Sequence, residues 1–306
     1  MSQHYKNHLS GFYNWEQLDH AGDWVLFPEN IGGHLCLDEV ALSDGELYTV
    51  LTNARARCQK GSLIAMVKGV KSGDVCRILE GIPIEKRQEV KEVSVDMANS
   101  MEKIASTSFP KASIVTDRFH VARLISEAVQ EIRIKHRWKA IEEENMAIKK
   151  AKKAKKKYIS PTYENGDSKK QLLARSRYLL FKSSYKWTDN QKTRSEILFR
   201  EYPDVKKAYE LSMMFRNIYE TARSVPQANE KFQEWNEKVK QKQFDAFITA
   251  AESINSHKET ILNFFKNRTT NALAENFNSK IKAFRSIFRG VRDIDFFLYR
   301  VSLIFA

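Results

Sequence analysis

Residues 34–42 read HLCLDEVAL, and this stretch decides the fold together with the two apolar runs that follow it. Turn residues separate it from ELYTVLTN at 46–53 and from SLIAMVKGV at 62–70. Short runs rich in strand-forming residues, bounded by turn residues, predict strands joined by hairpins. We therefore expect three hairpin-linked strands, the first of which ends at the acid Asp38.

The next 50 residues alternate between helical and strand patterns. A helix is predicted over 75–90 with Pro83 near its end, a strand over 90–99, a short helix over 101–109 and a strand over 112–119. Three hairpin-linked strands followed by helix, strand, helix and strand is the order of a ribonuclease H-like core. An unrelated α/β domain can show a similar order.

From about residue 121 to 265 the strand signals disappear. Apolar residues recur at helical spacing in 170–181, 191–203 and 204–219, which predicts a helical bundle inserted into the α/β domain. Within this region, seven lysines lie between Lys149 and Lys157. They form either a solvated helical face or an arm that contacts phosphates.

The charge of the chain is consistent with a nucleic-acid partner. It holds 51 Lys and Arg against 38 Asp and Glu among 306 residues, a formal net charge of +13. The same balance also fits a solvated basic protein without a polyanionic partner. No apolar run is long enough for a membrane span or a secretion signal, so we expect a cytoplasmic protein with Cys36, Cys58 and Cys76 as packing residues.

Two acids occupy matching places on predicted strands. Asp38 ends the first strand, and Asp96 ends the fourth. If these strands are neighbours, the two carboxylates converge at one edge of the sheet and can bind hard divalent cations. An acid at a strand end is otherwise a cap or turn residue.

A helix beginning near Thr270 and ending at Gly290 carries a third acid. At ~100° per residue, one stripe about 80° wide holds polar residues and the opposite stripe holds apolar ones. The polar stripe contains Asn271, Glu275, Asn278, Lys282 and Arg285, and the apolar stripe contains Leu273, Phe277, Ile281, Phe284 and Phe288. The polar stripe fits a carboxylate metal ligand beside groups that hold a nucleic-acid backbone, or simply the solvent side of an amphipathic helix.

Asp117 and His120 follow the fifth predicted strand. Two intervening residues let both side chains lie near the same sheet edge, where the imidazole could contact a phosphate or flanking base and the acid could fix its tautomer. The alternative is a histidine that caps the following helix.

Four ordered motifs resemble one family. They are LCLDEV at 35–40, EVSVDMANSM at 92–101, FPKASIVTDRFHV at 109–121 and NALAENFNSKIKAFRSIFRGV at 271–291. Together with RYLLFK and YPDVKKAYEL between them, they are similar to the insertion-sequence transposases of the ISL-three group, within the DDE superfamily. The resemblance runs from about residue 30 to the carboxyl terminus.

The resemblance implies an α/β fold with a ribonuclease H-like mixed sheet, interrupted by a large all-helical insertion. The implied organisation is an amino-terminal extension over 1–32, a first part of the core over 33–124, an insertion over 125–265 and a final part over 266–306. It also implies a catalytic and metal-binding triad at Asp38, Asp96 and Glu275. The implied cofactor is Mg²⁺, as two ions, with Mn²⁺ as a substitute.

The implied activity is metal-dependent cleavage at insertion-sequence ends and strand transfer into target DNA. A nuclease that does not join DNA and a non-catalytic DNA-binding derivative are the rival interpretations. DNA would be positioned by Asp117, His120, Asn271, Asn278, Lys280, Lys282, Arg285 and Arg289. Because many relatives carry a zinc-binding and helix-turn-helix region that is not found here, we expect a separately encoded end-recognition protein or a truncated copy. The resemblance further implies a homo-oligomer on DNA, in the bacterial nucleoid and away from membranes.

Overall fold

The computed structural model describes residues 4–42, 45–268, 272–287 and 293–306, and the backbone alone for 272–274. The chain divides into two compact units, each described by itself. The sheet unit comprises residues 1–120 and 259–306. The helical unit comprises residues 121–258. The sheet unit is therefore built from two separate pieces of the chain.

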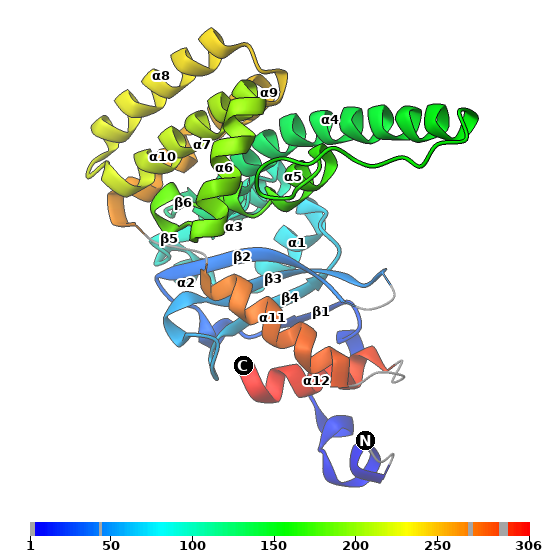
Figure 1. The fold of residues 1–306 in the computed structure, drawn as a ribbon. Helices are drawn as coiled ribbons and strands as arrows, with labels where there is room; N and C mark the ends of the chain where they lie inside the picture. The colour runs from blue at the N-terminus through cyan, green and yellow to red at the C-terminus, as the bar shows by residue number, and fades with distance from the viewer. Residues whose placement is uncertain (1–3, 43–44, 269–271, 288–292) are drawn as a thin grey trace. The chain divides into compact units, whose positions relative to one another are not determined.

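One mixed sheet organises the described part of the sheet unit (Figure 1). Its strands are β1 (Trp24–Leu26), β2 (His34–Ala41), β3 (Leu47–Asn53), β4 (Leu63–Lys68), β5 (Glu92–Val95) and β6 (Ser113–Thr116). Their order across the sheet is β1-β4-β3-β2-β5-β6. The β2, β3 and β4 strands pair antiparallel as hairpins, whereas β5 pairs parallel with β2 and β6 pairs parallel with β5. The mixed α/β fold and the ribonuclease H-like order predicted from the sequence are confirmed.

Helices cover both faces of the sheet. On one face, Leu35 and Leu37 of β2 pack with α1 (Ser72–Leu79) and α3 (Asn99–Ser108). On the other face, Val40 of β2 packs with α11 (Ala272–Ile287) and α12 (Ile294–Phe305). Because side chains alternate along a strand, Asp38 shares the face of Val40 and therefore the face covered by α11. Figure 1 shows α11 and α12 crossing this face.

Three local predictions need correction. The first predicted strand does not end at Asp38, because pairing with β3 continues it to Ala41. The helix predicted over 75–90 is two helices, α1 and α2 (Ile84–Gln88), since Pro83 has extended backbone and starts the second. The predicted extension also supplies a strand: β1 pairs with β4, and Val25 is buried in the core.

The helical unit consists of packed helices. Their bounds are α4 (Arg118–Lys153), which starts in the sheet unit, α5 (Lys169–Arg175), α6 (Asp189–Glu201), α7 (Pro203–Thr221), α8 (Val225–Lys242) and α9 (Asp245–Ser256). The next helix, α10 (Lys258–Asn267), belongs to the sheet unit from its second residue on. Trp235 on α8 is fully buried against Phe215 of α7 in an edge-on ring contact. Its indole nitrogen donates to the carbonyl of Leu211 at 3.0 Å, so the large ring is buried without a lost hydrogen bond.

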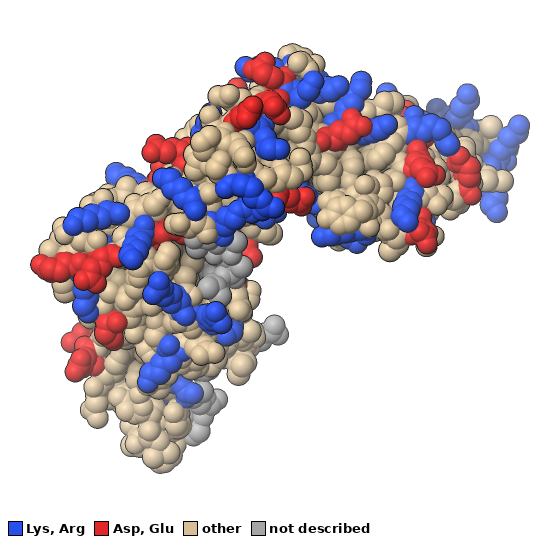
Figure 2. All heavy atoms as spheres, turned by 90° about the vertical axis from the view of Figure 1, so that its left-hand side faces the viewer, with Lys and Arg blue, Asp and Glu red and all other residues tan. Residues whose placement is uncertain are grey.

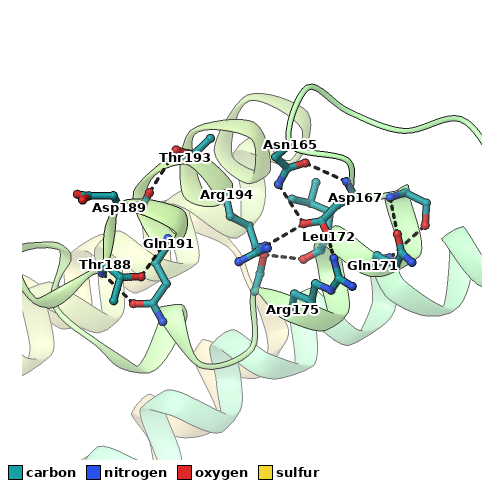
Figure 3. Close-up of polar contacts among 12 residues, drawn as sticks. Asn165, Asp167, Gln171, Leu172, Arg175, Thr188, Asp189, Gln191, Thr193 and Arg194 are labelled. Atoms are coloured by element: carbon teal, nitrogen blue, oxygen red, sulfur yellow. Dashed lines mark hydrogen bonds and ion pairs between the residues drawn. The ribbon is translucent and has the colours of Figure 1, made fainter.

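A buried carboxylate fastens the loop after α4 to the helices that follow it. The side chain of Asp167 is fully buried and accepts from Arg194 Nε at 2.8 Å and from Arg175 Nη1 (Figure 3). Asn165 Nδ2 donates to the same carboxylate at 3.0 Å. Burial alone would raise the pKa of Asp167, but the two guanidinium groups outweigh it and hold the pKa below its usual range.

Two further expectations concern cysteines and membranes. Cys36, Cys58 and Cys76 are buried and free of disulfides, as predicted for packing residues. Among the residues that the structure describes, no helix is both long enough and apolar enough to span a bilayer.

Candidate active site

Three acids form a row across neighbouring parallel strands. The β2–β5 register pairs Cys36 with Ser94, and the β5–β6 register pairs Val95 with Thr116. Asp38 lies two residues after Cys36, and Asp96 and Asp117 directly follow β5 and β6, so continuing the register brings the three acids to about the same level. The charges of Asp96 and Asp117 both act on Asp38. Adjacent strands are about 4.8 Å apart, and residues at one level point to the same face. We call Asp38, Asp96 and Asp117 the acid row.

Asp38 is held in place by two hydrogen bonds and has a perturbed acidity. Its Oδ1 accepts from the backbone amide of Glu39 at 2.8 Å, and its Oδ2 accepts from Asn278 Nδ2 at 2.8 Å. The pKa of Asp38 is raised to about 6, and burial is the largest cause. The Glu39 amide and the charge of His120 lower this pKa, whereas the charges of Asp96 and Asp117 make smaller contributions that raise it. The carboxylate is therefore crowded by like charges.

The other end of the row carries an imidazole. His120, in the first turn of α4, has Nδ1 3.1 Å from Asp117 Oδ2. A carboxylate only accepts, so Nδ1 carries the proton and Asp117 fixes the tautomer. This hydrogen bond is the largest cause of the raised pKa of His120, which burial opposes. Asp117 is 4% exposed, so the carboxylate that holds the His120 ring is itself buried in the protein.

The helix α11 brings Glu275 to the same place. Burial raises the pKa of Glu275, the charge of Asp117 raises it further, and His120 lowers it. The carboxylate therefore lies within electrostatic range of the end of the acid row. Phe277 and Ile281, two residues of the predicted apolar stripe, are buried against the sheet and hold the helix there.

The solvent face predicted for this helix is partly wrong. Asn278 and Arg285 are 8% and 6% exposed. Arg285 Nη2 lies 3.1 Å from Glu46 Oε1, and the guanidinium lies over the ring of Phe297. The cause is α12, whose apolar side chains join the face of the sheet beside α11 and enclose the flank of that helix. A helical-wheel analysis treats one helix alone and cannot detect this.

The remaining predicted DNA-contacting residues are spread along α11. Lys280 and Lys282 are exposed, and Lys280 Nζ also donates to the carbonyl of Cys58 at 3.0 Å. Asn271 and Arg289 lie outside the described residues. Asn278 was predicted to hold DNA, and its contact with Asp38 was missed, although its place one helical turn after Glu275 puts it on the same side of the helix.

The lysine run occupies the end of α4 and the residues that follow it. The last buried residue of α4 is Ala140, and all seven lysines from Lys149 to Lys157 are exposed. Within the described chain, no ion pair involves any of them. This arrangement fits both of the roles considered for the run.

The acids of this site are of the type that binds a hard divalent metal. Carboxylate oxygens are the ligands that Mg²⁺ prefers, and like charges near Asp38 are what a bound cation would offset. The fit lies in the type of donor and not in a closed ligand set: among the described residues, no three side chains of His, Cys, Asp or Glu stand close enough together to enclose a metal ion.

Comparison with known proteins gives the family of the chain. A family model described as Transposase, for the DDE transposases of the ISL-three group, matches residues 35–301. The chain is also similar to the Transposase for insertion sequence element IS1001 of Bordetella parapertussis, with 22% identity over 275 residues. That alignment covers 89% of this chain and 61% of the relative, so the chain spans less than two thirds of the length of the curated protein it matches. With most of its length matched by the family model, the chain belongs to the ISL-three group of DDE transposases.

Proposed function

We propose that this chain is the catalytic part of a transposase that cleaves DNA at insertion-sequence ends and joins the freed ends to target DNA, with Asp38, Asp96 and Glu275 as its catalytic carboxylates. The observation that carries this proposal is that the charge of Asp96, at the end of β5, acts on Asp38 of the parallel neighbour β2, on the face of the sheet against which α11, the helix of Glu275, packs. The helical unit would then be the insertion that separates the last acid from the first two.

The three carboxylates would hold two Mg²⁺ ions, with Mn²⁺ as a substitute, which would activate water and stabilise the charge that develops on the phosphate. Asn278 fixes the carboxylate of Asp38 by its 2.8 Å hydrogen bond. Asp117 fixes His120 through Nδ1, which leaves Nε2 to contact a phosphate or a flanking base. No side chain is needed as a covalent nucleophile.

The DNA substrate would be held by groups at the rim of this site. Lys280 and Lys282 on α11 suit phosphate contacts, and Asn271 and Arg289 are proposed for the same role from the sequence. The charge of Arg285 is already paired with Glu46, so we assign it to the packing of α11. We further propose that a homo-oligomer acts on the DNA of the nucleoid, with end recognition provided by a separately encoded protein.

The direct test is metal-dependent nicking and joining of DNA that carries the element's ends, with the end-recognition protein supplied. Glu275→Gln keeps the size of the side chain and removes its charge, so nicking should fall by about 10³-fold or more while DNA binding persists. Glu80→Gln is the matched control, since Glu80 is an exposed acid of the same unit at the end of α1. Full nicking by a folded Glu275→Gln protein would remove Glu275 from the catalytic centre.

The products separate the proposal from its nearest rival. Strand-transfer products in which an element end is joined to target DNA support a transposase. Nicking without any joined product, under conditions where both DNAs are present, would indicate a nuclease of the same fold.

A further inference from the structure

A second concave site lies at the opposite edge of the sheet from the acid row. This basic pocket is lined by residues 31–33, 55, 86, 88–91 and 111, and its volume is about 640 Å³. The strands β2, β5 and β6 begin here, directly after Gly33, Lys91 and Ala112. Gly33 and Lys91 are each five residues before an acid of the row, so at ~3.3 Å per residue the pocket is ~17 Å from that row along the strands.

The charge of the pocket is mainly positive. Its described lining includes the four cations Arg55, Lys86, Lys91 and Lys111 and one acid, Glu89. In the described part of the chain, none of these four cations is in an ion pair. Lysine and arginine side chains are spread over this side of the sheet unit in Figure 2, which faces the side where α2 lies in Figure 1. Four cations and one acid around one hollow leave an excess of positive charge, which attracts a polyanion.

The backbone that carries these cations is fixed. The amide of Lys91 donates to the carbonyl of Gly33 at 2.9 Å, which ties the start of β5 to the start of β2. Asn53 accepts from the amide of Arg55 at 3.0 Å and donates to the carbonyl of Asn30 at 2.9 Å. Lys86 Nζ donates to the carbonyl of Pro28 at 3.1 Å. The backbone at these positions and the ammonium group of Lys86 are therefore held before a ligand arrives, which reduces part of the ordering cost of binding.

The lining also narrows the class of ligand. No aromatic side chain is found among the described lining residues, so a nucleobase has no ring on which to stack. Two consecutive glycines, Gly32 and Gly33, form part of the wall and are half-buried. Exposed lysine and arginine side chains suit contacts with the phosphodiester oxygens of DNA. These oxygens are negatively charged and are the same at every base pair, so such contacts do not depend on sequence.

We propose that the basic pocket is a second DNA-backbone site, which binds a duplex segment at the edge of the sheet opposite to the acid row. The proposal rests on the function proposed above and adds to it the place where the sheet unit holds a segment of DNA other than the one being cut. The contribution of the pocket to DNA binding should not depend on the DNA sequence. Loss of the pocket should therefore change the affinity for DNA and its salt dependence, and not the rate of the chemical step.

The test compares two double variants that each remove two positive charges from the sheet unit. Lys91→Gln with Lys111→Gln neutralises the pocket, and Lys68→Gln with Lys103→Gln neutralises exposed lysines outside it. The probe is a fluorescein-labelled duplex of mixed sequence, about 30 base pairs or roughly three turns at ~10.5 base pairs each. Binding is measured by fluorescence anisotropy over a range of salt concentrations, with folding checked by thermal melting.

The pocket variant should bind this duplex about tenfold or more weakly at 0.1 M salt, and the slope of log affinity against log salt should fall by about two. The control pair should change both quantities much less. Unchanged binding by the pocket variant, or equal losses in both pairs, would overturn the proposal, since equal losses indicate only a diffuse positive field.

Nicking of a short end-containing DNA at saturating protein separates this proposal from the proposed function. The pocket variant should nick at the wild-type rate, because the acids are unchanged. If the wild-type chain nicks no end-containing DNA, the proposed function fails, and the binding measurement still decides the role of the pocket. A pocket variant with normal binding but slow nicking would also contradict a backbone site.

Discussion

Buried carboxylates have opposite electrostatic surroundings in the two units. In the helical unit, Asp167 is fully buried and satisfied by Arg175, Arg194 and Asn165. In the sheet unit, Asp38 is crowded by Asp96 and Asp117, and its pKa is raised to about 6 chiefly by burial. A buried carboxylate that is paired with cations helps to specify one fold. A row of carboxylates that repel one another lowers the free energy of unfolding unless a bound ligand offsets their charge. The contrast is the one expected if Asp167 serves structure and the acid row serves the proposed chemistry.

The largest expected effect is on catalysis, and it should come with no loss of stability. Asp38→Asn removes a charge that burial disfavours but also one of the two oxygens that accept hydrogen bonds from Glu39 and Asn278, so the two effects offset and the free energy of unfolding should stay within about 1 kcal/mol of wild type. Nicking should fall by about 10³-fold or more, because the carboxylates act as a unit. Chemical denaturation and a nicking assay on the same preparation measure both. A loss of about 2–3 kcal/mol, which is the loss we expect for Asp167→Asn below, would contradict the difference between the two units.

The reverse result is expected at Asp167. Asp167→Asn leaves Arg175 and Arg194 without their carboxylate, and the helical unit should lose about 2–3 kcal/mol, less than a fully buried pair because Arg175 is largely exposed. The pKa of Asp167 is lowered in the folded state, so its contribution is present above the unfolded value of about 3.9 and lost as the pH falls through the folded value. Denaturation at pH 7 and near pH 3 checks this: the difference between wild type and variant should shrink at the lower pH. A difference independent of pH would assign the loss to packing.

A smaller effect is expected at the imidazole. His120→Ala should slow nicking by about tenfold and leave metal affinity unchanged, since we assign His120 to substrate positioning. The matched change Asp117→Asn should lower the pKa of His120, because the hydrogen bond with Asp117 is the largest cause of its elevation. Isothermal titration with Mg²⁺ and an NMR titration of the ring measure the two results. Weakened metal binding by His120→Ala would place the imidazole among the metal ligands instead.

Much of the sheet could be predicted because its signals are local. The β2, β3 and β4 strands are joined by short connections, and each is a compact run of strand-forming residues. The β1 strand was missed because three residues carry little periodicity, and its pairing of Val25 with Met66 joins segments far apart in the chain. The extension of β2 beyond Asp38 likewise depends on its partner, since Ala41 is held by pairing with Leu47.

The candidate site was predictable in its members and less so in their surroundings. Asp38, Asp96 and Glu275 could be proposed from strand ends and a helix face, because those are properties of single elements. The neighbours that modify them come from other elements: Asn278 contacts Asp38, and Arg285 pairs with Glu46 across α11 and the start of β3. A sequence pattern does not contain these contacts, since they depend on how α11 and α12 pack on the sheet.

The division of the sheet unit between residues 1–120 and 259–306 has a consequence for protein synthesis. A ribosome adding ~5–20 residues per second needs roughly 7–30 s to make the helical unit after the acid row has emerged. During that interval the nascent chain has no α11, and therefore no Glu275 to complete the proposed triad. If the proposed triad is correct, fragments from interrupted translation would carry the acid row without the activity. The order of the chain would then delay activity until the segment with Glu275 has been made.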